Sequence, residues 1–190
     1  MKLAIPCIRD ILNNITKSVK IEADVSSTII IHLRCSDVPF ERYKSYHLYK
    51  YRAYIKAIKL ALTKHKFTNI EILYSTDHRC NPKNKFICDN VADSLKNYII
   101  RETKMPCTIL NDGTMASDVK RMLEAGCLVG FVGSFIYYVG ISKSKGIFIN
   151  SREQVGIPNT YYLNVLEDCI SHNDVKNYYD LPTLQVLLNS

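Results

Sequence analysis

The chain of 190 residues contains no tryptophan, only seven glycines and only six prolines. So little glycine and proline excludes collagen-like and low-complexity architectures. The longest apolar runs, such as residues 27–33 and 127–132, are far shorter than the roughly 18 residues that span a bilayer. Residues 1–6 hold no apolar stretch of the kind that directs secretion. These absences predict a folded protein in the cytoplasm or another intracellular compartment, without a membrane span.

The cysteine pattern lacks the spacings that mark metal sites and disulfide frameworks. Seven cysteines form no CxxC pair, and the two closest stand eight positions apart. We therefore expect mostly reduced thiols that pack as small apolar groups, with Cys107 and Cys127 inside apolar runs. Cys35, three residues after His32, is the one candidate for a thiol nucleophile.

The charge is positive but not concentrated. Twenty-five Lys and Arg against 18 Asp and Glu give a net charge of +7, which favours anionic partners such as nucleotides. The basic residues are dispersed along the chain, and no helix-turn-helix, RNA-recognition or zinc-finger pattern is present. Specific nucleic-acid binding is therefore not expected.

Apolar runs alternate with amphipathic stretches along most of the chain. This alternation is typical of an α/β protein, and the β-branched run at 27–33 is typical of a strand buried on both faces. We predict one Rossmann-like domain over residues 1–190: a doubly wound sheet of about five parallel strands with helices on both faces. Within this domain, residues 1–26 are an N-terminal helical segment and residues 151–190 are a tail with a helix. The expected strands are 27–33, 70–74, 107–110, 127–132 and 146–149, and the expected helices are 8–19, 46–66, 91–100, 114–125, 134–142 and 174–188.

Polar residues follow three of the expected strands, at the sheet edge where such folds bind ligands. Neither GxGxxG nor GxxxxGK[ST] is present, so a phosphate needs other ligands. His32 and Arg34 share one face of their strand, and an arginine there can clamp a diphosphate. An ion pair between Arg34 and Asp37 is the structural alternative. Gly133-Ser134 is either an anion-binding helix start or a plain helix cap.

The order of these segments resembles the fucosyltransferase superfamily that includes the α1,2-, α1,6- and protein O-fucosyltransferases. Residues 30–37 (IIHLRCSD) resemble its HxRxxD motif, and residues 72–77 (ILYSTD) its strand ending in a Ser/Thr-Asp pair. Residues 117–123 (SDVKRML) resemble its Asp-bearing helix, and residues 132–135 (VGSF) its small-Ser-Phe-Ser stretch. The resemblance extends over about residues 27–149.

The resemblance implies the donor-binding lobe of a GT-B-type transferase that uses GDP-fucose or a related GDP-sugar and needs no metal or other cofactor. Arg34 would hold the β-phosphate and act as a catalytic residue, because charge develops on phosphate as the nucleotide leaves. The other implied donor contacts are His32, Ser36, Asp77, Asp118, Gly133, Ser134 and Phe135, with Asp118 at the guanine base. Taken by itself, Asp118 is a solvated carboxylate on a helix.

Two positions depart from the pattern: Cys35 stands where the family has a second arginine, and Ile136 where it has a second serine. The general base is expected to be Glu41 or Asp37. The partners implied are a nucleotide sugar and a glycan acceptor. One lobe is smaller than a whole GT-B enzyme, so a second lobe, subunit or longer parent chain, or the tail, would recognise the acceptor. A non-catalytic Rossmann module that binds a nucleotide or polyanion is the alternative function.

Overall fold

The computed structural model describes residues 4–35, 47–74, 82–111, 113–131, 133–152, 157–170, 174–175 and 180–190. Within these residues one sheet of six strands forms the centre of the molecule, and every neighbouring pair of its strands is parallel. The strand order is β4-β3-β1-β5-β6-β7. The strands are β1 (Thr28–His32), β3 (Asn69–Leu73), β4 (Cys107–Leu110), β5 (Cys127–Val129), β6 (Ile147–Asn150) and β7 (Thr160–Tyr162).

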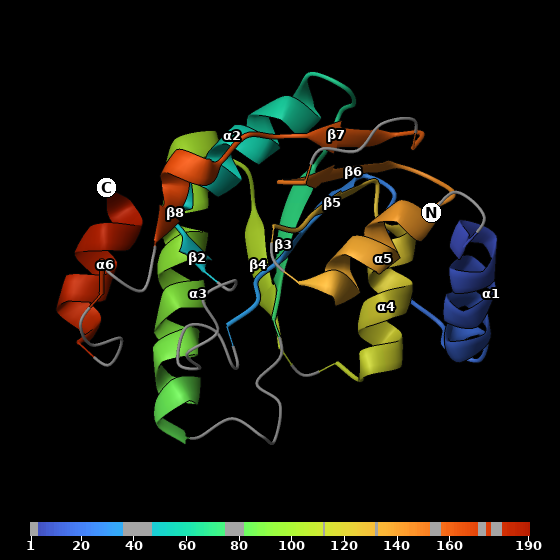
Figure 1. The fold of residues 1–190 in the computed structure, drawn as a ribbon, viewed down its shortest axis with the longest axis horizontal. Coiled ribbons are helices and arrows are strands. Elements are labelled where there is room, and N and C mark those ends of the chain that lie inside the picture. Colours follow the sequence, from blue (N-terminus) through green and yellow to red (C-terminus); the bar gives the residue numbers. More distant parts are fainter. Residues whose placement is uncertain are drawn as a thin grey trace.

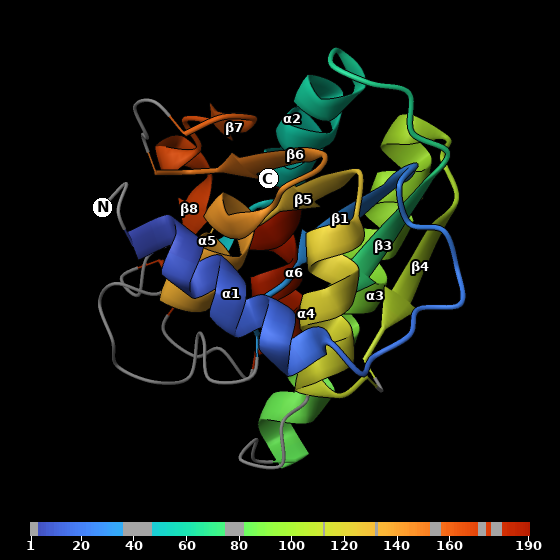
Figure 2. The ribbon, with the colours of Figure 1, turned by 90° about the vertical axis from the view of Figure 1, so that its right-hand side faces the viewer.

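Helices cover both faces of this sheet (Figures 1 and 2). The helices α2 (Tyr51–Leu62), α3 (Pro82–Thr103) and α6 (Leu181–Asn189) contact one another on one face. The helices α1 (Ala4–Thr16), α4 (Met115–Glu124) and α5 (Ser134–Ser142) do so on the other. The prediction of a doubly wound α/β fold is therefore confirmed.

The central strand β1 shows why both faces are covered. Its isoleucines are completely buried, and they alternate between two apolar clusters. Ile29 and Ile31 belong to the cluster beneath α2 and α3, whereas Ile30 belongs to the cluster beneath α4 and α5. A continuous apolar run is what a strand enclosed on both sides requires.

The strand order places a topological switch between β1 and β5. From β1 the chain moves outward through β3 to β4, and after returning at β5 it moves the other way through β6 to β7. Helices on opposite faces leave a crevice at the carboxyl ends of the two strands where such a sheet reverses. The edge between β1 and β5 is therefore where a ligand is expected.

Several element boundaries differ from the prediction. The helix expected over 46–66 begins only at Tyr51, because Leu48 and Tyr49 form β2, which pairs antiparallel with β8 (Cys169–Ile170). The helix α3 begins at Pro82, nine residues before the expected position, and proline suits the first turn because it needs no helical N–H partner. Strand β7 was not expected.

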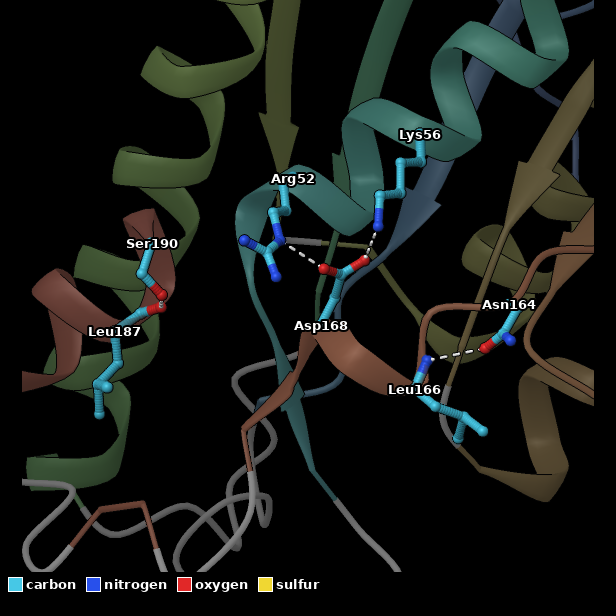
Figure 3. A network of polar contacts seen from close by, with 7 residues as sticks. All are labelled: Arg52, Lys56, Asn164, Leu166, Asp168, Leu187 and Ser190. Carbon is cyan, nitrogen blue, oxygen red and sulfur yellow. Dashed lines mark hydrogen bonds and ion pairs between the residues drawn. The ribbon is translucent and has the colours of Figure 1, made fainter.

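The tail is built into the fold rather than appended to it. It supplies β7, the short 3₁₀ helix η1 (Leu166–Asp168), β8 and α6. The completely buried carboxylate of Asp168 is bound by Arg52 and Lys56 of α2 (Figure 3). Among the described residues, no helix is both long enough and apolar enough to cross a membrane.

The expectation of reduced packing thiols is wrong for one pair of cysteines. Cys35 and Cys88 form a disulfide with their Cα atoms 5.6 Å apart, and it joins the segment after β1 to α3. The two cysteines are 53 residues apart in the sequence, so no local spacing motif predicts this pairing. Cys107 and Cys127 are buried free thiols, as expected. Cys80 lies outside the described residues.

Candidate functional site

The site centres on Arg34, two residues beyond the end of β1. Gly133, just before α5, has a φ of 97°, a conformation that side chains rarely adopt. A Cβ on Gly133 would lie 2.7 Å from Nη1 of Arg34. The Arg34 guanidinium and the start of α5 are therefore in close contact at the edge between β1 and β5. Only glycine permits both the backbone conformation and this approach.

Helix α5 begins at Ser134 and is capped by Gly133, which has no side chain to bond the first turn. The interpretation of Ser134 as the helix cap is therefore wrong, because Ser134 is the first helical residue and its side chain is exposed. The amino end of a helix carries partial positive charge and N–H groups that bind anions. Together with Arg34 it makes this edge suitable for a phosphate.

His32, the last residue of β1, lies beside this group. Its ring centroid is 6.1 Å from that of Phe135, in the first turn of α5. Its Nδ1 is buried and has no hydrogen-bond partner among the described residues. Burial, with a smaller contribution from the charge of Arg34, lowers the pKa of His32 to about 4. The imidazole is therefore neutral near pH 7, and its Nδ1 is a buried polar atom beside this edge.

Asn150, which the sequence analysis missed, lies at the same edge. It ends β6, is 2% exposed, and its Oδ1 accepts from the backbone N–H of Arg152 at 2.7 Å. In the part of the chain that the structure describes, its Nδ2 has no hydrogen-bond partner. Ile30 and Phe148 both face the cluster beneath α5. Since faces alternate along a strand, His32 and Asn150 face that side as well. A single asparagine ending the apolar run IFIN was the available signal.

Ile136, which stands where the fucosyltransferase pattern has a second serine, is not placed to contact a ligand. It is 1% exposed, and its side chain fills the space that a Cβ on Gly130 would need. Position 136 therefore packs α5 onto β5. This packing agrees with the departure of position 136 from the serine of the fucosyltransferase pattern.

Asp118 lies in the first turn of α4, above the carboxyl end of β4. Thr114 caps this helix by accepting a hydrogen bond from the Ser117 N–H at 3.2 Å. The Asp118 carboxylate lies against Gly113 and raises the pKa of Arg121, although the hydrogen bond from Arg121 to Glu71 is the larger cause. Asp118 is thus on the same sheet edge as Arg34, with β3 between β4 and β1.

The remaining predicted residues, Ser36, Asp37, Glu41 and Asp77, lie outside the described residues, so both base candidates and the Arg34–Asp37 pair stay predictions. The prediction that Cys35 could be a thiol nucleophile is wrong, because its sulfur is bonded to that of Cys88. Within the part of the chain that the structure describes, no group of three or more His, Cys, Asp or Glu is arranged around a metal position.

The structure thus brings together His32, Arg34, Gly133, Ser134 and Phe135 at the switch point, and it adds Asn150. A comparison with protein-family models and a search of curated proteins both found no match to this chain. The arrangement can bind an anion through a guanidinium and a helix amino end, with buried polar atoms alongside.

Proposed function

We propose that this protein binds the diphosphate of a nucleotide sugar at the edge between β1 and β5 and transfers the sugar to a glycan hydroxyl. The observation that carries the proposal is the contact between Arg34 and Gly133 at the start of α5. It joins two independent anion-binding features, a guanidinium and a helix amino end, at the switch point. The resemblance to fucosyltransferases points to GDP-fucose as the donor.

In this reaction the acceptor hydroxyl attacks the anomeric carbon of the donor while the bond from that carbon to the phosphate oxygen breaks. The bonding electrons leave with the nucleoside diphosphate. Arg34 and the amino end of α5 stabilise the negative charge that develops on the leaving group. The hydroxyl proton passes to a carboxylate, for which Asp37 and Glu41 are the candidates.

His32 supports the leaving group as a hydrogen-bonding group rather than as a charge. Its depressed pKa, about 4, keeps it neutral at physiological pH, so it does not repel Arg34. The imidazole would contact the nucleotide, as the resemblance implies. Asp118 would read the guanine base from α4, as the resemblance implies.

A non-catalytic nucleotide-binding module is the second candidate, and two observations favour it. Cys35, at the position of the family's second arginine, is held in a disulfide. Ile136, at the position of its second serine, packs into the core. A module with these changes keeps the anion site and lacks part of the cationic clamp.

Thermal unfolding in the presence of GDP, UDP or ADP tests the binding step, because a ligand that binds only the folded state raises the melting temperature. We expect GDP to give the largest rise and Arg34→Ala to abolish it. Arg101→Ala is the matched control, since Arg101 is exposed on α3 and pairs with its neighbour Glu102. An equal response to all nucleotides, or an unchanged response in Arg34→Ala, would contradict the proposal.

Turnover separates the two candidates. The transferase releases GDP from GDP-fucose faster when its acceptor is present, and it forms a glycosylated product. The binding module shows the GDP-dependent rise in melting temperature without either reaction.

A further inference from the structure

A polar hollow lies away from Arg34, at the outer edge of the sheet. It has a volume of about 520 Å³ and lies between α3 and the edge strand β4. This volume falls within the range of small-molecule sites, roughly 300–1,000 Å³. The hollow is lined by Tyr74, Asp89, Asp93, Lys96, Thr108, Ile109 and Asn111.

One face of α3 supplies the charged wall. Asp89, Asp93 and Lys96 are spaced four and three residues apart, so they lie one above another along the helix. Thr108 and Ile109 of β4 supply the opposite wall. Helix and strand thus present polar groups to each other across the hollow.

A hydrogen-bond network holds the end of the hollow near the carboxyl ends of β3 and β4. The Tyr74 hydroxyl donates to Oδ1 of Asp89 at 2.7 Å, and Nδ2 of Asn111 donates to the Tyr74 hydroxyl at 3.2 Å. Lys85 Nζ donates to Oδ2 of Asp89 at 2.7 Å. The preceding residue, Cys88, is fixed by its disulfide. This end of the hollow is therefore formed before any ligand arrives.

Three lining side chains remain available for a ligand. The hydrogen bonds at the hollow join Tyr74, Lys85, Asp89 and Asn111. Among the described residues, the side chains of Asp93, Lys96 and Thr108 make no hydrogen bond or ion pair. They offer a carboxylate acceptor, an ammonium donor and a hydroxyl that does both. The hollow therefore presents donors and acceptors within one small volume.

The charges around the hollow cancel. Asp89 and Asp93 are opposed by Lys85 and Lys96, so neither an anion nor a polycation meets a field of the opposite sign. The edge at Arg34, in contrast, is positively charged, because a guanidinium lies beside a helix amino end. A neutral ligand with several hydroxyls fits the hollow best, because each hydroxyl can donate and accept.

We propose that the hollow between α3 and β4 binds a neutral saccharide, which in the proposed reaction is part of the glycan acceptor. The acceptor role rests on the proposed function, whereas saccharide binding does not. Tyr74 and Asn111 place the hollow at the same sheet edge as Arg34, and β4 lies two strands from β1. At the usual strand spacing β1 and β4 are about 10 Å apart, and because the hollow faces α3 whereas His32 faces α5, a glycan that reaches both must pass over the sheet edge.

Two-dimensional NMR of the full chain, titrated with a panel of neutral mono- and oligosaccharides, tests this proposal. We expect shifts at the backbone amides of Asp93, Thr108 and Asn111, and a dissociation constant about tenfold or more higher in Asp93→Ala. Asp10→Ala is the matched control, because Asp10 is exposed on α1 across the sheet. Melting temperatures of both variants establish that they fold.

Arg34→Ala separates this proposal from the proposed function. It is expected to abolish the GDP response and to leave saccharide binding unchanged. Saccharide binding at the hollow supports the inference whether or not GDP binds. The inference is overturned if no neutral saccharide shifts these amides, or if spermidine or inorganic phosphate binds the hollow more tightly than any saccharide.

Discussion

Lys56 Nζ lies 2.6 Å from Oδ2 of Asp168, whose carboxylate is completely buried (Figure 3). Arg52 donates to the other oxygen of the same carboxylate. Both basic side chains remain more than two-fifths exposed, so only the acid has lost its water. This contact ties the tail to α2, next to the β2–β8 pair.

Asp168→Asn is expected to lower the free energy of unfolding by about 2–3 kcal/mol, because hydrogen bonds to a charged group are lost. Denaturant titration measures this change. Glu124→Gln is the matched control, since Glu124 is exposed and its i,i+4 pair with Lys120 contributes only about 0.5 kcal/mol. If the two substitutions lower the free energy of unfolding equally, the buried carboxylate contributes no more than an exposed pair.

The stability from Asp168 also depends on pH. Burial raises the pKa of this carboxyl, but the hydrogen bonds from Lys56 and Arg52 outweigh burial and hold the pKa below its usual value. Its contribution is therefore present above the unfolded pKa, 3.8, and is lost as the pH falls through the folded pKa. Comparing unfolding of the protein and of Asp168→Asn across acidic pH isolates this loss.

Gly133→Ala is expected to destabilise the fold by about 1–3 kcal/mol and to weaken GDP binding, because an alanine there is strained and meets Arg34. Unfolding and nucleotide titrations measure the two effects. The double variant with Arg34→Ala removes the collision and retains the backbone strain. If Gly133→Ala costs the same in both backgrounds, the two residues do not interact.

His32 is expected to stay neutral down to about pH 4, since burial and the charge of Arg34 lower its pKa from 6.5. The unfolded chain takes up this proton first, so stability is complete above about pH 6.5 and falls as the pH drops towards 4. NMR titration of the imidazole measures the pKa directly. His32→Asn should flatten this part of the stability profile, and an ordinary titration near 6.5 would contradict the assignment.

The Cys35–Cys88 disulfide is expected to stabilise the fold by about 2–4 kcal/mol. Intact mass before and after reduction detects the bond, and the double substitution Cys35→Ser, Cys88→Ser should lower the melting temperature. Because Cys35 follows Arg34, the same change should weaken GDP binding. Cys7→Ser, at an exposed free thiol, should change neither quantity. Free thiols at both Cys35 and Cys88 in the oxidised protein would refute the pairing.

The fold was predictable where the signal is local. The isoleucines of β1 and the apolar run at β4 identify their strands without any distant contact. Leu48 was predicted to be helical, because it continues the spacing of α2, yet it pairs with Ile170. Met115 fits the apolar stripe of α4 but is 66% exposed. Pairing and exposure depend on residues far along the chain, which a periodic pattern does not contain.

The site was predictable to the same extent. His32 ends an apolar strand, Arg34 and Gly133 follow apolar strands, and parallel strands bring such residues to one edge. The contact between Arg34 and Gly133 depends on the helix approach, and the hollow beside α3 depends on the spacing between α3 and β4. A short sequence motif predicts neither the approach of the helix nor the spacing between α3 and β4.

The disulfide also makes residues 35–88 a covalent ring that contains all of α2 and β3. A protease that cuts once between Cys35 and Cys88 releases no fragment, because both new ends stay attached through the bond. Such a nicked chain keeps its full mass apart from one added water, and it separates into two pieces only after reduction. Cleavage between Cys35 and Cys88 therefore separates the chain into two pieces only when the disulfide is reduced.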